Sequence, residues 1–161
     1  MGEQIEHEQE TLRVNLLLNR ASRWADIYSY IPYQGRVDLK MKAPSKSVLV
    51  RAPEWVSTGG TDIAPKVNGA RRPLRWQGRY VDLGAAKPGE TLVVTFPIFE
   101  RTVKEKIGPQ TYSLALKGNN VVSIDPPGQN GPLYADRGNY RKDQVQWLKL
   151  RRFVPDESIR W

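Results

Sequence analysis

Cysteine is absent from the 161-residue sequence, and histidine occurs once, as His7. The lack of thiols excludes disulfide bonds, zinc sites built on thiolates and a cysteine nucleophile. Serine–histidine catalysis or a histidine metal site needs an imidazole held by a folded scaffold. His7 instead stands in the polar leader MGEQIEHEQE. We therefore expect neither a metal ion nor a cofactor.

Long apolar runs are also missing. No stretch approaches the ~20 consecutive apolar residues that a membrane-spanning helix needs. The first residues are acidic and lack the apolar core of a secretory signal. The sequence predicts no membrane contact and no export signal, and it slightly favours a cytoplasmic location.

Negative charge is scarce relative to positive charge, because 25 Lys and Arg face 17 Asp and Glu, which gives a net charge of +8. Such an excess can indicate an anionic partner such as nucleic acid. The cations are spread out, however: Arg36, Lys40 and Lys42 alternate with apolar residues, as outward positions of a half-buried sheet do. The dense run at 149–152 fits a solvated face or an acidic neighbour domain. We predict no nucleic-acid partner.

Period-2 patterns dominate the chain. Leu92, Val94 and Phe96 alternate with more polar neighbours, which is typical of a strand with one buried face. Similar strands are predicted over 11–19, 36–42, 47–51, 79–83, 111–117, 120–125 and 147–154. Asn68-Gly69 predicts a type I′ hairpin turn, and Pro88-Gly89 suits a type II turn. The fold class predicted is all-β: an antiparallel, jelly-roll-like β-sandwich of eight to ten strands.

The predicted organisation is simple. Residues 1–10 form a flexible leader, and residues 11–161 form a single β-sandwich domain. The first strand is expected to place Leu12, Val14, Leu16 and Leu18 on one face, and residues 20–34 form an aromatic-rich connection. No amphipathic helix longer than two turns and no repeat is visible.

Four segments in order suggest a family. They are VRAPEWV (50–56), VNG (67–69), GRYVDLGAAKPGETLVVTFP (78–97) and LALKGNNVVSIDPPG (114–128). Their order and spacing resemble the C-terminal region of proteins related to the β-L-arabinofuranosidases of glycoside hydrolase family 127. The resemblance covers nearly the whole chain from Leu12 onward.

The resemblance implies an accessory role. Members of that family carry an N-terminal (α/α)6 barrel, in which cysteines and a glutamate hold a zinc ion and one cysteine is the proposed nucleophile. This sequence has no cysteine, so none of those catalytic residues can be assigned to it. The expected partner is a catalytic barrel domain, or a second copy of the chain, and the expected role is non-catalytic support with carbohydrate contact as a further function.

Carbohydrate binding is the sharpest binding hypothesis from the residues themselves. Sugars pack their C–H faces on flat aromatic rings while polar neighbours bind the hydroxyls. Six aromatic residues with polar neighbours are the candidates: Trp24, Tyr28, Tyr30, Tyr33, Trp55 and Trp76. The alternative is that these rings seal the ends of the sandwich or pack against the barrel.

Hydrolysis by the chain itself would need two carboxylates about 5–9.5 Å apart. The candidates are Glu54, Glu100 and Asp125, with Glu54 beside Trp55 as the best general acid. A calcium site from Asp125, Asn130, Asp136 and Asn139 is conceivable, but their spacing matches no defined calcium loop. A free-standing carbohydrate-binding module and a small hydrolase with a carboxylate pair remain the alternatives.

Overall fold

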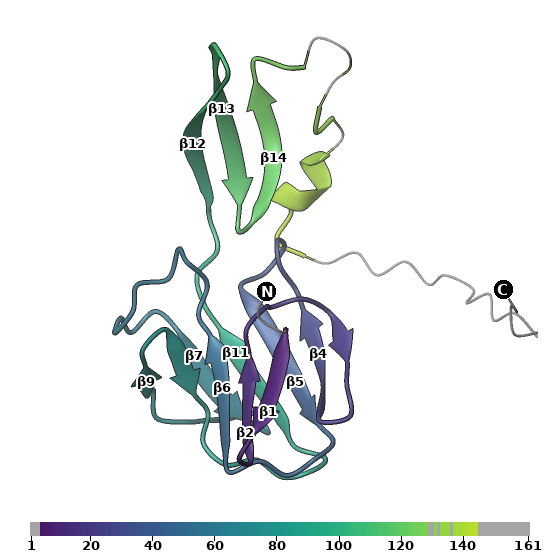
Figure 1. Cartoon of the computed structure of the whole chain (residues 1–161), viewed down its shortest axis with the longest axis vertical. Helices are drawn as coiled ribbons and strands as arrows, with labels where there is room; N and C mark the ends of the chain where they lie inside the picture. The colour runs from purple at the N-terminus through teal and green to yellow at the C-terminus, as the bar shows by residue number, and fades with distance from the viewer. Residues whose placement is uncertain (1–3, 129–130, 132, 136, 145–161) are drawn as a thin grey trace, which may run out of the picture.

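The computed structural model describes residues 4–128, 131, 133–135 and 137–144. Within these residues the chain is all-β, with 14 strands and one 3₁₀ helix, η1 (Arg137–Arg141) (Figure 1). The predicted fold class is confirmed. The strand number exceeds the prediction because several strands have only two residues. The strands are β1 (Ile5–Glu8), β2 (Thr11–Val14), β3 (Arg20–Ala21), β4 (Ala25–Ser29), β5 (Arg36–Met41), β6 (Ser47–Arg51), β7 (Ala64–Val67), β8 (Ala70–Arg71), β9 (Trp76–Gln77), β10 (Tyr80–Asp82), β11 (Thr91–Thr95), β12 (Glu100–Ile107), β13 (Gln110–Lys117) and β14 (Asn120–Asp125).

Two sheets form a sandwich. The first sheet has the order β1-β2-β6-β10-β9, and the second has the order β3-β4-β5-β11-β7-β8. Neighbouring strands pair antiparallel except β2 and β6, which pair parallel with Leu12 opposite Val48 and Val14 opposite Val50. The two sheets enclose one apolar core (Figure 1).

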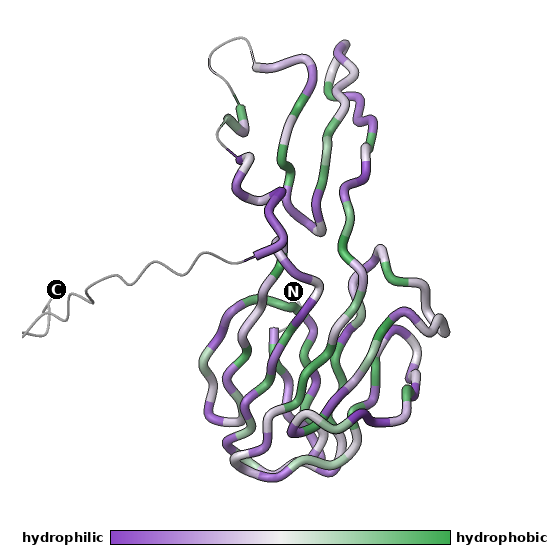
Figure 2. The backbone as a smooth tube through the Cα atoms, turned by 180° about the vertical axis from the view of Figure 1, so that it is seen from behind, coloured by the Kyte–Doolittle hydropathy of each residue, from purple (hydrophilic) through white to green (hydrophobic). Residues whose placement is uncertain are grey.

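The core follows directly from the alternation in the sequence. Leu12 and Val14 of β2 and Leu92 and Val94 of β11 are fully buried, while their neighbours along each strand are more exposed. In the sandwich, hydrophobic and hydrophilic stretches alternate along the backbone (Figure 2). Burial of such side chains contributes roughly 1.5–3 kcal/mol each, and the sandwich therefore depends on this single cluster.

Both predicted turns are confirmed by the backbone. Asn68 and Gly69 have φ values of 49° and 83°, as a type I′ turn between β7 and β8 requires. Gly89 has φ 86°, and the amide of Glu90 donates to the carbonyl of Lys87 at 3.2 Å, as expected for a type II turn.

Two predictions near the N-terminus differ from the structure. Ile5–Glu8, placed in the flexible leader by its charges, forms β1 against β2 and buries Ile5. The strand expected over 11–19 ends at Val14, and one further backbone bond follows it, from the amide of Asn15 to the carbonyl of Gln4 at 2.8 Å. Leu16 and Leu18 are consequently 48% and 58% exposed. The predicted connection at 20–34 contains β3 and β4, and the predicted strand at 147–154 lies outside the described residues.

The third sheet, β12-β13-β14, extends away from one end of the sandwich (Figure 1). The sequence predicted one sandwich over 11–161, whereas these strands pair only with each other among the described strands. A period-2 pattern indicates a strand but does not say which sheet it joins, so this separation was not predictable from alternation.

The two faces of the third sheet differ in chemistry. Cross-strand partners share a face, so Val103, Leu114 and Ile124 form one apolar row, and Leu116 extends it two residues along β13. We call these four half-buried residues the apolar face. The opposite face carries Ser113 and Lys117, and η1 packs on it.

Candidate functional site

A cleft of about 500 Å³ opens where the third sheet meets the sandwich. It is lined by residues 15–19, by Ser29 and Ile31, by 51–55 and by Asn119 and Asn120 of the β13–β14 turn. We call it the rim cleft. Its volume falls within the range of about 300–1,000 Å³ that is usual for small-molecule sites. It is the place where polar and aromatic side chains from distant parts of the sequence converge.

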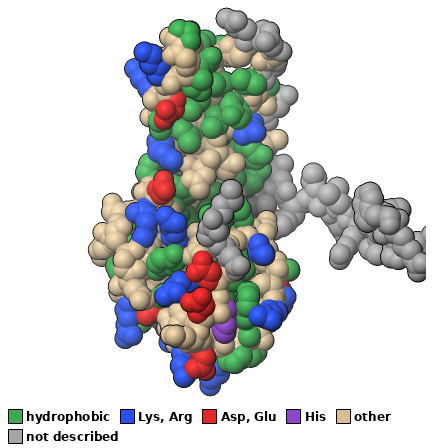
Figure 3. All heavy atoms as spheres, in the orientation of Figure 1, with side chains coloured by type: hydrophobic (Ala, Val, Ile, Leu, Met, Phe, Trp, Pro, Cys, Tyr) green, Lys and Arg blue, Asp and Glu red, His purple; other side chains and the backbone are tan. Residues whose placement is uncertain are grey.

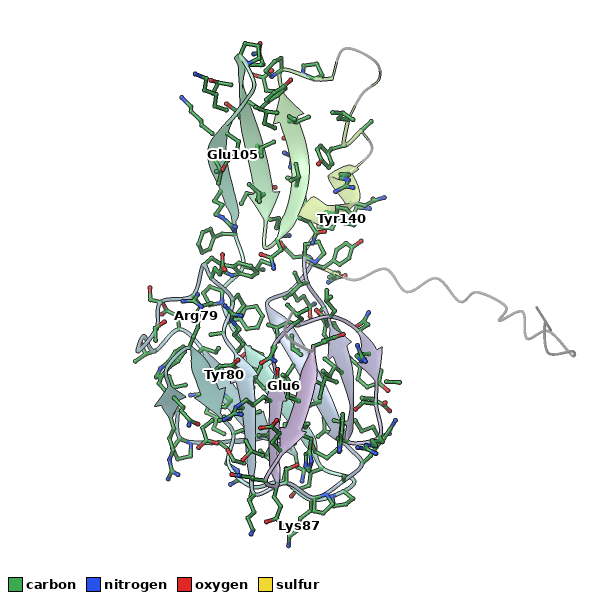
Figure 4. All side chains as sticks on the ribbon, in the orientation of Figure 1. Glu6, Arg79, Tyr80, Lys87, Glu105 and Tyr140 are labelled. Atoms are coloured by element: carbon green, nitrogen blue, oxygen red, sulfur yellow. The ribbon has the colours of Figure 1, made fainter. Side chains whose placement is uncertain are left out.

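Trp55 forms part of the apolar wall of the rim cleft. Its indole Nε1 donates to the carbonyl of Pro97 at 2.9 Å, and its ring meets Phe96 edge-on at 6.2 Å between centroids. Arg79, labelled in Figure 4, donates to the carbonyls of Pro53 and Val56 and so supports the loop that carries Trp55. The ring position is therefore determined on several sides.

The β13–β14 turn sits directly on this wall. Gly118 has φ 59°, and a Cβ at this position would lie 3.1 Å from both Ile31 and Ile98 and 3.3 Å from Trp55. Arg101 donates to the carbonyl of Gly118 at 2.8 Å, with its guanidinium 5.5 Å from the centroid of the Trp55 ring. A glycine is needed here, because the turn both adopts positive φ and approaches its neighbours closely.

The loop of residues 15–19 is held by bonds from β1 and β10. The side-chain amide of Gln4 donates from Nε2 to the carbonyl of Leu18 at 2.9 Å. Asn15 donates to Glu6 at 2.9 Å and accepts from the hydroxyl of Tyr80 at 2.7 Å. Glu6 and Tyr80 are labelled in the sandwich in Figure 4. These contacts give the rim cleft a preformed floor.

Four polar side chains of the rim cleft, unlike that of Asn15, have no bonding partner among the described residues. Those of Arg51, Glu54, Asn119 and Asn120 form no hydrogen bond or ion pair with any described residue. Glu54 was predicted beside an apolar wall, but its side chain is exposed. As far as the described residues go, these four groups are available to a ligand.

The six predicted aromatic residues do not form one site. Trp24 and Tyr30 flank opposite ends of β4, whose four residue steps span about 13 Å. Trp24 stacks on His7, and Tyr30 lies under the guanidinium of Arg36. Only Trp55 of the six lines the rim cleft.

The other aromatic candidates have structural contacts or lie elsewhere. Tyr33 meets Tyr140 edge-on at 5.9 Å, and Trp76 donates to the carbonyl of Gly60 at 3.2 Å while packing on the core. Tyr28 is 43% exposed on β4. Their role as sugar platforms stays a prediction.

The three predicted carboxylates are spread over separate elements. Glu54 lies in the sandwich loop, whereas Glu100 and Asp125 lie on β12 and β14. In the strand register, Glu100 lies opposite Lys117 and Asp125 lies opposite Ser113. Lys117 and Ser113 are four residues apart on β13, so the two carboxylates are separated by about 13 Å along that strand alone. Glu100 also accepts a bond from Arg141 at 2.9 Å. This placement differs from the spacing of about 5–9.5 Å that a glycosidase pair needs.

Within the described residues, no group of three or more His, Cys, Asp and Glu side chains is arranged to hold a metal ion. Of the four residues considered for calcium, Asn130 and Asp136 lie outside the described part of the chain. No described helix has the length and apolar character to cross a bilayer.

In the part of the chain that the structure describes, one titratable group is clearly perturbed. Arg36 donates from Nε and Nη2 to the two carboxylate oxygens of Asp38, each at 2.7 Å. This bidentate bond raises the pKa of Arg36 above its usual value. The pair lies on the outer side of the second sheet, away from the apolar core, and it stabilises β5 rather than forming part of the rim cleft.

Sequence reasoning missed most of the rim cleft. The sequence predicted Arg51 as the last residue of the strand at 47–51 and Asn120 as the first residue of the strand at 120–125. Both descriptions are correct locally. Nothing in the sequence shows that Asn119 and Arg51 line the same cleft, because this depends on how the third sheet is placed against the sandwich.

By sequence, no family model and no curated protein matches the chain. The structure, in contrast, is similar to parts of larger solved proteins. A GH127 beta-arabinofuranosidase matches with a TM-score of 0.55 and 18% identity, over 70% of this chain and 22% of that protein. A GH127 beta-L-arabinofuranosidase from Geobacillus stearothermophilus T6 matches with a TM-score of 0.50 and 17% identity, over 73% and 20%. A protein described as a glycoside hydrolase matches with a TM-score of 0.51 and 15% identity, over 68% and 20%.

The fold is that of a part of GH127 enzymes. This confirms the resemblance suggested by the four sequence segments, at the level of the fold. The chain spans about a fifth of the length of these solved proteins. At 15–18% identity the similarity concerns architecture, and the chemistry of the chain has to be argued from its own residues.

Proposed function

We propose that this chain is a non-catalytic accessory module of a glycoside-hydrolase-like protein, and that it packs against a catalytic barrel through the apolar face of the third sheet. The observation that carries the proposal is that face itself. Val103, Leu114, Leu116 and Ile124 stay half-exposed, and η1, the one described element that packs on this sheet, lies on the opposite side.

The apolar face is large enough to be visible as a patch. Hydrophobic side chains gather over β12, β13 and β14 in the space-filling view, with charged residues at the margins (Figure 3). A contiguous apolar patch with a polar rim is typical of a protein–protein interface. Further apolar surface lies nearby, because Ile107 at the β12–β13 turn is 63% exposed.

The choice of a barrel as the occupant rests on length. The solved proteins that share this fold are about five times longer than the region shared with this chain. Most of such a protein therefore lies outside the region compared, and an apolar sheet face next to it is naturally covered by the remainder. The positions of Glu100 and Asp125 support a non-catalytic role, since their rows lie about 13 Å apart along β13, beyond the spacing of a glycosidase pair.

The docking hypothesis is tested with two adjacent residues of β13. Leu114 belongs to the apolar face and Ser113 points to the other face, and both are half-buried. We expect the chain and its Ser113→Lys variant to bind a separately produced GH127-type barrel in sedimentation velocity. Leu114→Lys should not bind it. Equal binding by all three proteins would rule out docking through this face.

Self-association is the alternative role of the same face. Oligomers of the chain alone that Leu114→Lys abolishes, without any binding to the barrel, would favour it. Turnover of arabinose-, xylose- or glucose-containing substrates by the purified chain would contradict the non-catalytic assignment. Loss of that turnover in Glu54→Gln would identify the small-hydrolase alternative.

A further inference from the structure

We propose that the rim cleft binds a neutral carbohydrate, with Arg51, Glu54, Asn119 and Asn120 as the hydrogen-bonding groups. The inference is independent of docking through the apolar face, because the four residues lie outside that face. It assigns carbohydrate contact to a site that includes only one of the six aromatic residues predicted from the sequence.

The polar groups of the cleft match hydroxyls in type. A sugar hydroxyl donates one hydrogen bond and accepts others, so it is best bound by a mixture of donors and acceptors. The Arg51 guanidinium only donates, the Glu54 carboxylate only accepts, and the amides of Asn119 and Asn120 do both. None of these side chains is engaged by a described residue, so a ligand that binds them breaks no bond within the described part of the chain.

The apolar side of the cleft matches the C–H surface of a sugar. Trp55 and Ile31 line it together with Leu16, Leu17 and Leu18. Leu16 and Leu18 are unusually exposed for leucine side chains beside a core. A ligand with both hydroxyls and a C–H surface would cover them while it satisfies the four polar groups.

The net charge of the cleft favours a neutral ligand. Arg51 and Glu54 have opposite charges and lie in the same wall, three residues apart. An anion such as phosphate would gain from Arg51 but would be repelled by Glu54. A neutral polyol accepts bonds from one and donates bonds to the other.

The cleft is preorganised. Gln4 holds the carbonyl of Leu18, Arg101 holds that of Gly118, and Trp55 is bonded to Pro97. The three bonds hold, respectively, the loop of residues 15–19, the β13–β14 turn and the loop that carries Trp55. A ligand would therefore spend little free energy on ordering loops.

The test is titration of the full chain with arabino-, xylo- and gluco-oligosaccharides, followed by NMR chemical-shift mapping and calorimetry. At least one sugar is expected to shift the amides of 15–19, 51–55 and 118–120. Arg51→Ala and Asn119→Ala should each weaken its affinity about tenfold, because each removes hydrogen bonds to the ligand. Inorganic phosphate should leave these amides unshifted.

Matched controls are available on the same protein. Arg71→Ala removes an exposed arginine on β8, and Glu105→Gln neutralises an exposed carboxylate on β12. The controls should bind as the unmodified chain does. Silence with every sugar, shifts that map elsewhere, unchanged affinity in Arg51→Ala and Asn119→Ala, or binding of phosphate alone would each overturn the proposal. None of these results would bear on the docking of the apolar face.

Discussion

Trp55 donates its indole N–H to the carbonyl of Pro97 at 2.9 Å. This bond joins the loop after β6 to the linker that leads from β11 into the third sheet. Arg101 completes the connection, because it contacts both the Trp55 ring and the carbonyl of Gly118. The sandwich and the third sheet therefore meet through a small set of identifiable contacts, and these contacts also shape the rim cleft.

Trp55→Phe should loosen this connection without unfolding the sandwich. The substitution removes one hydrogen bond and part of the ring, which costs about 1 kcal/mol. We expect amide shifts of Gly118–Asn120 to change in NMR spectra. Trp76→Phe removes a similar indole bond, to Gly60, and should leave those amides unchanged. The same spectral change in both variants would contradict a local role for Trp55.

Gly118→Ala should destabilise the protein more than Gly108→Ala. Both glycines occupy turns of the third sheet, with φ values of 59° and 61°. An L-residue in this conformation costs about 1–2 kcal/mol at either site. A Cβ at Gly108 meets open space, whereas one at Gly118 presses on Ile31 and Ile98. Urea unfolding measures the difference, and equal losses would argue against close packing of the β13–β14 turn.

Lys117→Met should release η1 from the third sheet. The side chain of Lys117 is only 5% exposed. Its ammonium donates to the carbonyls of Arg141 and Lys142 and to the carboxylate of Asp143. Loss of these charge-assisted bonds costs about 1–3 kcal/mol locally. The exposed Asp143 adds little to that figure.

Hydrogen exchange measures the effect of Lys117→Met. The amide of Lys142, which donates to Asn139 at 3.2 Å, should exchange faster. Lys104→Met is the control, because Lys104 is exposed on the same face of the sheet. Unchanged exchange in Lys117→Met would mean that other contacts hold η1.

Asp38→Asn should destabilise the protein by about 1 kcal/mol through the loss of a bidentate bond to Arg36. The figure is small because the Arg36 side chain is 41% exposed, so solvent screens the pair. Asp26→Asn is the comparison, since Asp26 pairs with Lys42 through a single carboxylate oxygen on the neighbouring strand. If Asp38→Asn lowers the free energy of unfolding no more than Asp26→Asn does, the second hydrogen bond of the Arg36–Asp38 pair adds no stability.

The pH dependence of this pair follows from the direction in which the pKa of Arg36 is shifted. Asp38 raises the pKa of Arg36 in the folded protein, so the associated stability is fully present below the unfolded value and is lost as pH rises through the folded value. The ordinary pKa of arginine already lies far above the neutral range. Titration of Arg36 should therefore leave the stability unchanged from about pH 6 to about pH 10. Denaturant midpoints across this range, compared between Asp38→Asn and the unmodified chain, measure this.

Local patterns predicted local structure well. The strand at 47–51 and the one at 120–125 have the expected bounds, and the hairpin turn at Asn68-Gly69 and the type II turn at Pro88-Gly89 follow from Asn-Gly and Pro-Gly chemistry. Prediction was weaker where backbone pairing between strands outweighs the charged composition of a segment. Ile5–Glu8 joins a sheet despite its charges, because β2 offers it a complete set of backbone partners.

The site was less predictable than the fold. Trp55 and Glu54 were identified because an aromatic residue beside a carboxylate is a recognisable pattern. Arg51 has no such pattern, and Asn120 lies far from both in the sequence. These residues meet because Gly118 lets the β13–β14 turn approach Trp55, which is a tertiary relationship that residue spacing does not encode.

The central place of β11 has a consequence for synthesis on the ribosome. β11 pairs with β5 on one side and β7 on the other, although both precede it in the chain. Until residues 91–95 emerge, the two edges that they will join have no partner, and unpaired edges promote aggregation. The third sheet, in contrast, comes from one continuous stretch whose hairpins pair locally and hence form quickly. Translation products that end before Thr91 should therefore be insoluble, and closure of the sandwich waits for its middle strand.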